Sequence, residues 1–343
     1  MTIKDLAAQT GYSVGTVSRV LNVQPNVSQK ARDAILAKAR ETGFQLNVNA
    51  RQLKQQHATS ILVVVKGTSN ELFSGLLEAI QTRIAQTRYP LLVDYVDEDA
   101  NEVHQAVRLC REKKPLGVLF LGGNSDHFKS DFQKIDLPCV LVTGDASELG
   151  FPNLSSVSTD DREAARCAVD RLVALGHRKF ALVGGDRIHS DISRLRYEGC
   201  LQSFQEHGIV FDEIKDYKSV RFSYGDGYRA TDQLLAEGRK FTALFAASDV
   251  MAIGAMRALR DHGLQVPDDV SVMGFDGLPL GTYYIPQLST VVQPVEQLAR
   301  RSVELLISCI ERSGAAQYLT VPFDVLQKES TAQMEEKGET MDA

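Results

Sequence analysis

The residues with the clearest binding chemistry lie near the N-terminus, on a short predicted helix that begins at Ser13. Val17, Val20 and Leu21 recur at helical spacing and form its inner face. The residues left on the outer face are Ser13, Val14, Gly15, Thr16, Ser18 and Arg19. An outer face without acidic residues suits a DNA groove, which is lined by phosphates and base edges. The pattern therefore predicts a helix that lies in the major groove.

Two further predicted helices hold this one in place. Thr2 caps the first helix, and Gly11 ends it, where a left-handed backbone is cheapest for glycine. Ser28 caps the third helix, whose inner face carries Ala31 and Ile35. This arrangement indicates a helix-turn-helix within a three-helix head. From the pattern alone, a three-helix bundle without a ligand is the alternative.

Length and charge divide the chain into a head and a larger body. At 343 residues the chain is too long for one compact domain. Residues 1–57 contain eight Lys or Arg and three acidic residues, whereas the whole chain has a net charge of −6. A basic head on an acidic body favours contact with phosphates at one end only.

Several functional classes find no support in the sequence. The five cysteines are scattered without C-x-x-C spacing, which favours free thiols in a reducing, cytoplasmic compartment over a disulfide framework or a metal site. No apolar run reaches about 18 residues, so we expect no membrane span. Motifs for hydrolases, metalloproteases, phosphate-binding loops and dinucleotide binding are absent. We therefore expect a protein that is not an enzyme and uses no cofactor or metal.

The body alternates apolar strands with amphipathic helices in two series. The expected strands are 61–65, 91–95, 117–121 and 138–142, then 180–183, 243–246 and 270–273. The expected helices are 73–85, 101–111, 161–175, 193–206, 227–237, 249–262 and 295–312. Continuous apolar strands between helices indicate parallel sheets covered on both faces. The fold class is thus an all-α head plus an α/β body of two doubly wound subdomains, with a ligand cleft at the strand ends.

The head resembles that of the lactose/galactose repressor family of helix-turn-helix regulators. The matching positions are Thr2, Ile3, Asp5, Leu6, Ala7, Gly11, Ser13, Thr16, Val17, Ser18, Arg19, Val20, Leu21 and Asn22. Thr10 and Tyr12 depart from the family pattern beside the turn. The body resembles the family's domain of periplasmic-binding-protein type through 248–254, 266–276 and 286–294, together with 175–178 and 326–331.

The resemblance implies roles for residues of the head and of the segment that follows it. Val14 and Gly15 stand where the family sets operator preference, and because neither side chain can make a bidentate base contact, Arg19 is expected to carry the main polar readout. The other expected DNA-contacting residues of the head are Thr2, Ser13, Thr16, Ser18, Asn22 and Asn26. The segment with Ala50, Arg51 and Leu53 resembles the family's hinge helix, in which a leucine wedges between base steps. The alternative for Leu53 is a linker leucine that packs on the core of the protein itself. The proline that usually precedes this helix in the family is absent here.

The resemblance also implies an effector site in the cleft. Its expected residues are Phe73, Asp160, Arg196, Phe222, Ser248 and Asp276. A strand-end carboxylate such as Asp276 can accept hydrogen bonds from adjacent sugar hydroxyls, and five fixed donors on Arg196 suit a sugar ring or a carboxylate. The alternatives are that Asp276 caps a turn and that Arg194 and Arg196 lie on a solvated helix face. Ser190 and Ile192 lack the charge of nucleobase-binding members, which favours a sugar over a purine.

Together these observations predict a homodimeric, sequence-specific transcription regulator, a repressor of carbohydrate-utilisation genes that binds a palindromic operator and a sugar-like effector. The expected parts are a head at 1–45, a hinge and linker at 46–57, an effector-binding and dimerisation domain at 58–331 and a flexible tail at 332–343. Two alternatives remain: a ligand-binding receptor without DNA function, and a co-repressor-dependent regulator of another pathway. The sequence leaves open the effector's identity, whether it induces or co-represses, and whether the protein is a dimer or a tetramer.

Overall fold

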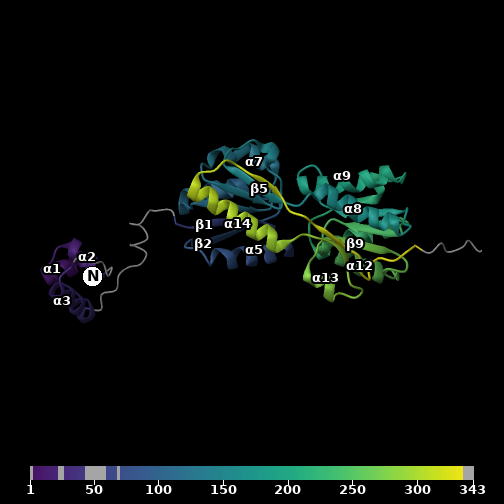
Figure 1. The fold of residues 1–343 in the computed structure, drawn as a ribbon. Coiled ribbons are helices and arrows are strands. Elements are labelled where there is room, and N and C mark those ends of the chain that lie inside the picture. Colours follow the sequence, from purple (N-terminus) through teal and green to yellow (C-terminus); the bar gives the residue numbers. More distant parts are fainter. Residues whose placement is uncertain (1–2, 22–26, 43–58, 68–69, 335–343) are drawn as a thin grey trace, which may run out of the picture. The chain divides into compact units, whose positions relative to one another are not determined.

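The computed structural model describes residues 3–21, 27–42, 59–67 and 70–334. The chain divides into two compact units, Met1–His57 and Ala58–Ala343 (Figure 1). We refer to them as the head and the body.

The described part of the head consists of three helices around a small core. They are α1 (Ile3–Thr10), α2 (Val14–Leu21) and α3 (Gln29–Glu41). The core residues are Leu6, Ala7, Val17, Val20, Ile35 and Ala39. Gly11 in the turn has a φ of 69°, and Ser13 and Ser28 accept hydrogen bonds from Thr16 N and Ala31 N at 3.2 and 3.3 Å. The predicted helix-turn-helix is therefore confirmed, with the predicted glycine and serines at its helix ends.

The body contains two six-stranded sheets, each covered by helices on both faces. In sheet order, the first holds β11 (Tyr318–Thr320), β5 (Leu154–Ser158), β4 (Cys139–Val142), β3 (Gly117–Leu121), β1 (Ile61–Lys66) and β2 (Leu91–Val96). The second holds β12 (Asp324–Leu326), β10 (Ser289–Val292), β9 (Ser271–Asp276), β8 (Ala243–Ala246), β6 (Phe180–Gly184) and β7 (Tyr217–Ser219). Apart from the antiparallel pair β10–β12, neighbouring strands are parallel.

In the first subdomain, α5 (Glu71–Ile84) and α14 (Val295–Arg312) cover one face of the sheet. The other face is covered by α6 (Glu102–Lys113) and α7 (Ser125–Asp131). Short 3-10 turns lie at Phe132–Lys134 and Ser147–Leu149. In the second subdomain, α8 (Asp161–Ala174) and α9 (Asp191–Glu206) cover one face, and α11 (Tyr224–Ala236) and α12 (Asp249–Asp261) cover the other. Two short helices, α10 (Glu213–Asp216) and α13 (Pro279–Tyr283), complete it. The predicted fold class is confirmed.

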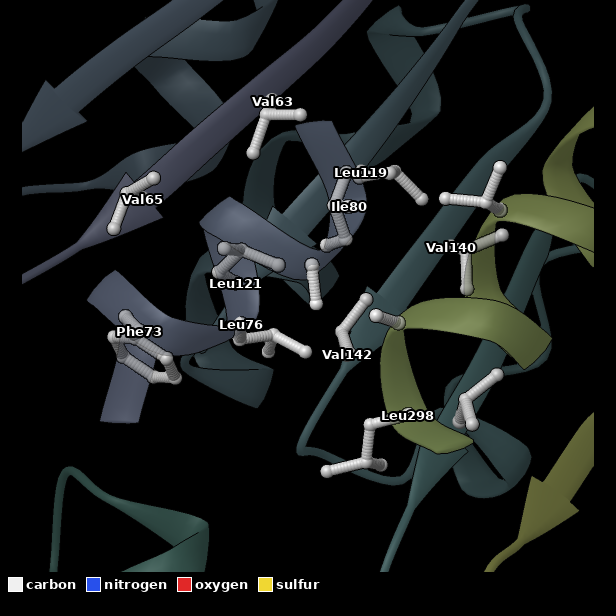
Figure 2. Packing of buried hydrophobic residues seen from close by; sticks show 14 of the residues in the cluster. Val63, Val65, Phe73, Leu76, Ile80, Leu119, Leu121, Val140, Val142 and Leu298 are labelled. Atoms are coloured by element: carbon white, nitrogen blue, oxygen red, sulfur yellow. The ribbon is translucent and has the colours of Figure 1, made fainter. Parts of the chain in front are cut away.

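The chain passes between the two subdomains three times, after β5, after β10 and after β11. The second passage takes α14 back to the first sheet, where Leu298 packs in the same apolar cluster as Leu76, Val140 and Val142 (Figure 2). Because 295–312 follows the strands of the second series in the sequence, this helix was expected to belong to that series. That expectation is wrong, because the apolar face of α14 packs against the first sheet.

Strand β5 was missed because three of its five residues are serines. All five are nonetheless buried, and Ser155 and Ser156 accept hydrogen bonds from Gln317 N and Ala146 N, both at 3.1 Å. The short strands β7, β10, β11 and β12 were missed too, since three or four residues carry little periodic signal. Among the described helices, none is long and apolar enough to cross a membrane.

Candidate functional site

A cavity of about 350 Å³ lies between the two subdomains of the body. Its walls come from loops that follow parallel strands, the place where this class of fold binds ligands. The first subdomain contributes Lys66, Phe73, Gly122, Asn124, His127 and Thr143, and the second contributes Asp186, His189, Ser190, Arg196 and Phe222, while Gln293 lies in a connecting segment. The volume falls within the range of small-molecule sites.

The structure brings three of the six expected effector residues together in the cavity wall: Phe73, Arg196 and Phe222. Asp276 lies directly behind them, because its Oδ1 accepts a 2.8 Å hydrogen bond from Gln293 and lies 3.7 Å from Arg196 Nη1. Asp160 and Ser248 are absent from the cavity lining and cap helices instead. They accept hydrogen bonds from Glu163 N at 3.0 Å and Met251 N at 3.3 Å, at the starts of α8 and α12.

Arg196 is fixed from several directions. Its Nε donates to Asp161 Oδ1 at 2.7 Å, its Nη1 donates to the carbonyl of Ala247 at 2.5 Å, and its guanidinium stacks on Phe275 at 3.6 Å. Only 3% of the residue is exposed, so the alternative of a solvated helix face is wrong for Arg196. It holds for Arg194, whose exposed side chain pairs with Asp191 and Glu198.

Asp276 is a buried carboxylate with spare hydrogen-bonding capacity. Its Oδ2 has no partner among the described residues, and its backbone φ of 119° is unusual for a residue with a side chain. Burial raises the pKa of Asp276 to about 7, although Arg196 and Gln293 pull that pKa downward. Burial also raises the pKa of Asp161 and of Asp249, which accepts hydrogen bonds from Thr290 Oγ1 and Leu278 N. A ligand hydroxyl that reached Oδ2 would give this carboxylate the donor it lacks.

The wall of the first subdomain is built around Glu102, whose side chain is fully buried. Its Oε2 accepts from Lys66 Nζ at 2.7 Å and lies 2.8 Å from His127 Nδ1, while its Oε1 accepts from Asn124 N at 2.7 Å. Lys66 and His127 both reach the cavity. Thr143 lies in the same wall with a φ of 73°, and its buried hydroxyl has no partner within the described ranges.

Contacts between the subdomains occur beside the cavity lining. Asn124 Nδ2 donates to the carbonyl of His189 at 2.6 Å, and Ser125 N donates to Asp191 at 3.1 Å. Tyr224 OH donates to Glu71 at 2.6 Å. These contacts close the two subdomains around the cavity, so an opening motion of the body has to break them.

Sequence reasoning missed Lys66, Asn124, His127, Thr143 and Gln293. Lys66 is the last residue of β1, and Thr143 follows β4, so their positions at strand ends were a usable signal. His127 and Asn124 belong to α7 and its cap, a helix that was not predicted.

On α2 and at Ser13 before it, the structure exposes Ser13, Val14, Gly15 and Arg19 and leaves Thr16 and Ser18 half-buried. Ser13 and Thr16 share a 3.0 Å hydrogen bond between their hydroxyls. Arg19 forms no ion pair with any residue that the structure describes. The other expected DNA-contacting residues, Thr2, Asn22, Asn26, Ala50, Arg51 and Leu53, lie outside the described residues, as does the whole of the expected hinge and linker at 46–57.

Within the described ranges, no three His, Cys, Asp or Glu side chains gather in a way that could hold a metal ion. Among the acidic side chains of the cavity lining, Asp186 Oδ2 lies 2.7 Å from His189 Nδ1, and Asp99 and Glu98 lie 3.1 and 3.6 Å from Arg221.

Comparison with known proteins places these features in context. Residues 2–47 match the family model "Bacterial regulatory proteins, lacI family", and residues 169–331 match the model "Periplasmic binding protein-like domain". The regulator MalR of Clostridium butyricum is 34% identical over 334 residues, which cover 96% of this chain and 99% of that protein.

Solved structures are similar to this chain over nearly its whole length. The lac repressor dimer bound to operator and the anti-inducer ONPF is similar with a TM-score of 0.76 at 27% identity, over 97% of this chain and 99% of that one. The regulator CelR in complex with cellobiose is similar with a TM-score of 0.69 at 26% identity, over 96% of this chain and 99% of that one.

Proposed function

Because this chain belongs to the LacI family of bacterial regulatory proteins, we propose that it represses carbohydrate-utilisation genes by binding operator DNA under the control of a sugar-like effector. The observation that carries the proposal is the joining, in one chain, of a helix-turn-helix head to a body with a polar and aromatic cavity. Its relatives are regulators of transcription, and such a protein acts where the chromosome lies, in the bacterial cytoplasm.

In the proposed complex, α2 of the head lies in the major groove. The exposed guanidinium of Arg19 supplies the polar base contact, and Val14 and Gly15 allow the helix to approach the base edges closely. Ser13, Thr16 and Ser18 contact phosphate or sugar groups, and Leu53 wedges between base steps in the minor groove. An exposed recognition helix favours this function over a receptor that has lost DNA binding.

We propose that the protein acts as a homodimer on a palindromic operator. A two-fold axis relating two heads calls for two operator half-sites in inverted orientation. The similar lac repressor structure is a dimer bound to operator.

The proposed effector contacts come from both walls of the cavity. Phe73 and Phe222 pack against the apolar face of a sugar ring, and Arg196 and the free Oδ2 of Asp276 bind its hydroxyls. Asp160 and Ser248 support the wall as helix caps. The regulator CelR, which this chain resembles, has been solved with cellobiose.

Control of DNA binding then follows from a population shift. An effector that binds the closed body more tightly than the open one changes the fraction of heads held in an operator-binding arrangement. Such coupling between sites typically amounts to about 1–3 kcal/mol. The sign of the effect, release or co-repression, is read directly from operator affinity with and without effector.

The test is a binding assay with a palindromic duplex selected from a random pool, at low salt, with and without sugars. We expect tight binding that changes when a sugar is added. Leu53→Ala should weaken specific binding more than non-specific binding, whereas the adjacent Gln52→Ala serves as the control. Absence of binding to any palindromic duplex in either ligand state would refute the function, and equal losses on both kinds of DNA would refute the wedge.

A further inference from the structure

Charged side chains from the two subdomains meet beside the cavity. The acidic residues 97–99 follow β2, an edge strand of the first sheet, and Arg221 follows β7, an edge strand of the second. Nη2 of Arg221 lies 2.5 Å from Asp97 Oδ1 and 3.1 Å from Asp99 Oδ2. Its Nε lies 3.6 Å from Glu98 Oε2. One guanidinium thus faces three carboxylates across the boundary between the subdomains, and we refer to these four residues as the Arg221 cluster.

The Arg221 cluster borders the cavity from both subdomains. Glu98 and Asp99 belong to the cavity lining, and so does Phe222, the residue that follows Arg221. Burial raises the pKa of Glu98, while Arg221 and a backbone hydrogen bond with Phe222 lower that pKa. The cluster therefore holds the backbone at Phe222 against the first subdomain, and with it the aromatic side chain that lines the cavity.

The strength of the cluster comes from the number of charges that share one partner. A single ion pair between exposed side chains contributes little, because water screens it, whereas a network contributes more. Here three carboxylates share one guanidinium, and the side chain of Glu98 is only 31% exposed. Without Arg221 the three adjacent carboxylates would repel one another. All four groups belong to this chain, so their attraction acts whether or not the cavity is filled.

The Arg221 cluster differs in kind from the other contacts that close the body. Every ion pair that the structure describes across the subdomain boundary involves Arg221. The other contacts named above are hydrogen bonds, such as the one that Ser125 N donates to Asp191 at 3.1 Å. The contact between Ser125 and Asp191 shares no residue with the Arg221 cluster. It therefore reports independently on whether the subdomains are closed.

We propose that Arg221 is a positioning residue for effector binding, which keeps the body closed through the carboxylates at 97–99 and does not itself contact the effector. The inference rests on the proposed function, since it concerns the same cavity, but closure is measurable without effector or DNA. A ligand that touches Phe73 on one wall and Phe222 on the other needs both walls in place. Loss of the cluster should therefore weaken its binding by the factor by which the closed fraction falls.

The experiment measures hydrogen exchange in the full-length chain, without added sugar or DNA, by mass spectrometry with fragmentation to single residues. The Ser125 amide is the reporter, because opening of the body breaks its hydrogen bond to Asp191. Arg221→Met should speed the exchange of this amide about threefold or more, while amides of the buried strand β3 keep the wild-type rate. Arg221→Lys should retain part of the protection.

The matched control is Arg257→Met, since Arg257 is exposed and pairs with Asp261 on its own helix α12. It makes the same change in net charge and should leave the exchange of the Ser125 amide unchanged.

Two further changes approach the cluster from its other side. Asp97→Asn combined with Asp99→Asn removes two partners of Arg221 from the first subdomain and should speed the exchange of the Ser125 amide as Arg221→Met does. Raising the salt concentration to about 1 M screens exposed charges and should speed exchange in the wild type. The effect of salt should be smaller in Arg221→Met, which has already lost the cluster.

Three outcomes would overturn the inference. The first is an unchanged rate at the Ser125 amide in Arg221→Met, and the second is an equal increase in Arg257→Met. The third is faster exchange that extends to β3, because it would show a general loss of stability and not an opening between the subdomains. None of these outcomes bears on operator binding, which the duplex assay tests separately, so the inference and the proposed function fail independently.

Discussion

The two walls of the cavity combine charges in opposite ways. On the second wall, one buried guanidinium, Arg196, lies between two carboxylates, Asp161 and Asp276. On the first wall, one buried carboxylate, Glu102, lies between Lys66 and His127. The second wall is therefore left with an unused acceptor, Asp276 Oδ2, and the first with the third hydrogen-bond donor of Lys66. The contrast indicates that the two ends of a bound ligand meet different chemistry.

The largest expected effect comes from removing the central charge of the second wall. Arg196→Met leaves Asp161 and Asp276 buried without their cation, which should lower the free energy of unfolding by about 3–5 kcal/mol. Urea denaturation measures this loss. The exposed Arg194→Met is the control and should change stability by less than about 0.5 kcal/mol. Similar losses for the two variants would contradict the structural role of Arg196.

The carboxylates of the second wall also predict how stability depends on pH. Since the pKa of Asp276 is raised to about 7, the folded protein holds a proton between pH 4 and 7 that the unfolded chain has released. Stability should therefore fall as pH rises through this window, by at most about 4 kcal/mol for this group.

Asp276→Asn cannot titrate, so its unfolding free energy should depend less steeply on pH over the same window. A residual slope should remain, because the pKa values of Asp161 and Asp249 are raised too. The exposed Asp136→Asn is the control and should keep the wild-type slope. An unchanged slope in Asp276→Asn would show that this carboxylate is ionised throughout.

On the first wall the corresponding loss should be smaller. Lys66→Met leaves Glu102 its contacts with His127 and Asn124 N, so we expect a loss of about 1.5–3 kcal/mol, measured by urea denaturation. Lys113→Met, which replaces an exposed lysine of α6, is the control and should leave stability nearly unchanged. A loss equal to that of Arg196→Met would contradict the difference between the walls, because it would mean that removing Lys66 leaves Glu102 as poorly compensated as Asp161 and Asp276 are without Arg196.

The smallest expected effects on stability come from adding a Cβ to glycines of the first subdomain. Gly122 has a φ of 75°, and a Cβ there would lie 2.9 Å from Cζ of Phe73, so Gly122→Ala should cost about 1–2 kcal/mol of stability and shift the Phe73 ring. Gly75→Ala, in α5 with nothing within 4 Å of the added Cβ, should stabilise the protein by about 0.5–1 kcal/mol. Thermal or urea denaturation of the pair checks both signs.

Sequence patterns predicted the fold well where burial is continuous. β3 and α14 have the predicted bounds because each is a long apolar or amphipathic run between clear breaks. The patterns failed where polar atoms are satisfied by tertiary partners, as in β5, and where a helix returns to a distant sheet, as α14 does.

The candidate site was predicted only in part, for a related reason. Arg196 and Asp276 were expected in one place and do lie together, but Asp160 and Ser248 cap helices, a local role that the same side chains also suit. Lys66 and His127 escaped notice because what unites them is Glu102, 36 and 25 residues away in the chain. A cluster held together by one buried carboxylate has no signature in local sequence.

The central claim is that a ligand in the body cavity sets the affinity of the head for operator DNA. Its most direct test is the dissociation constant for the selected palindromic duplex, with and without a saturating amount of the sugar that binds most tightly, in the wild type and in Phe222→Ala. The account predicts a change of about fivefold or more in the wild type, and a much smaller one in Phe222→Ala at the same sugar concentration. An operator affinity that stays the same while the sugar demonstrably fills the cavity would contradict it.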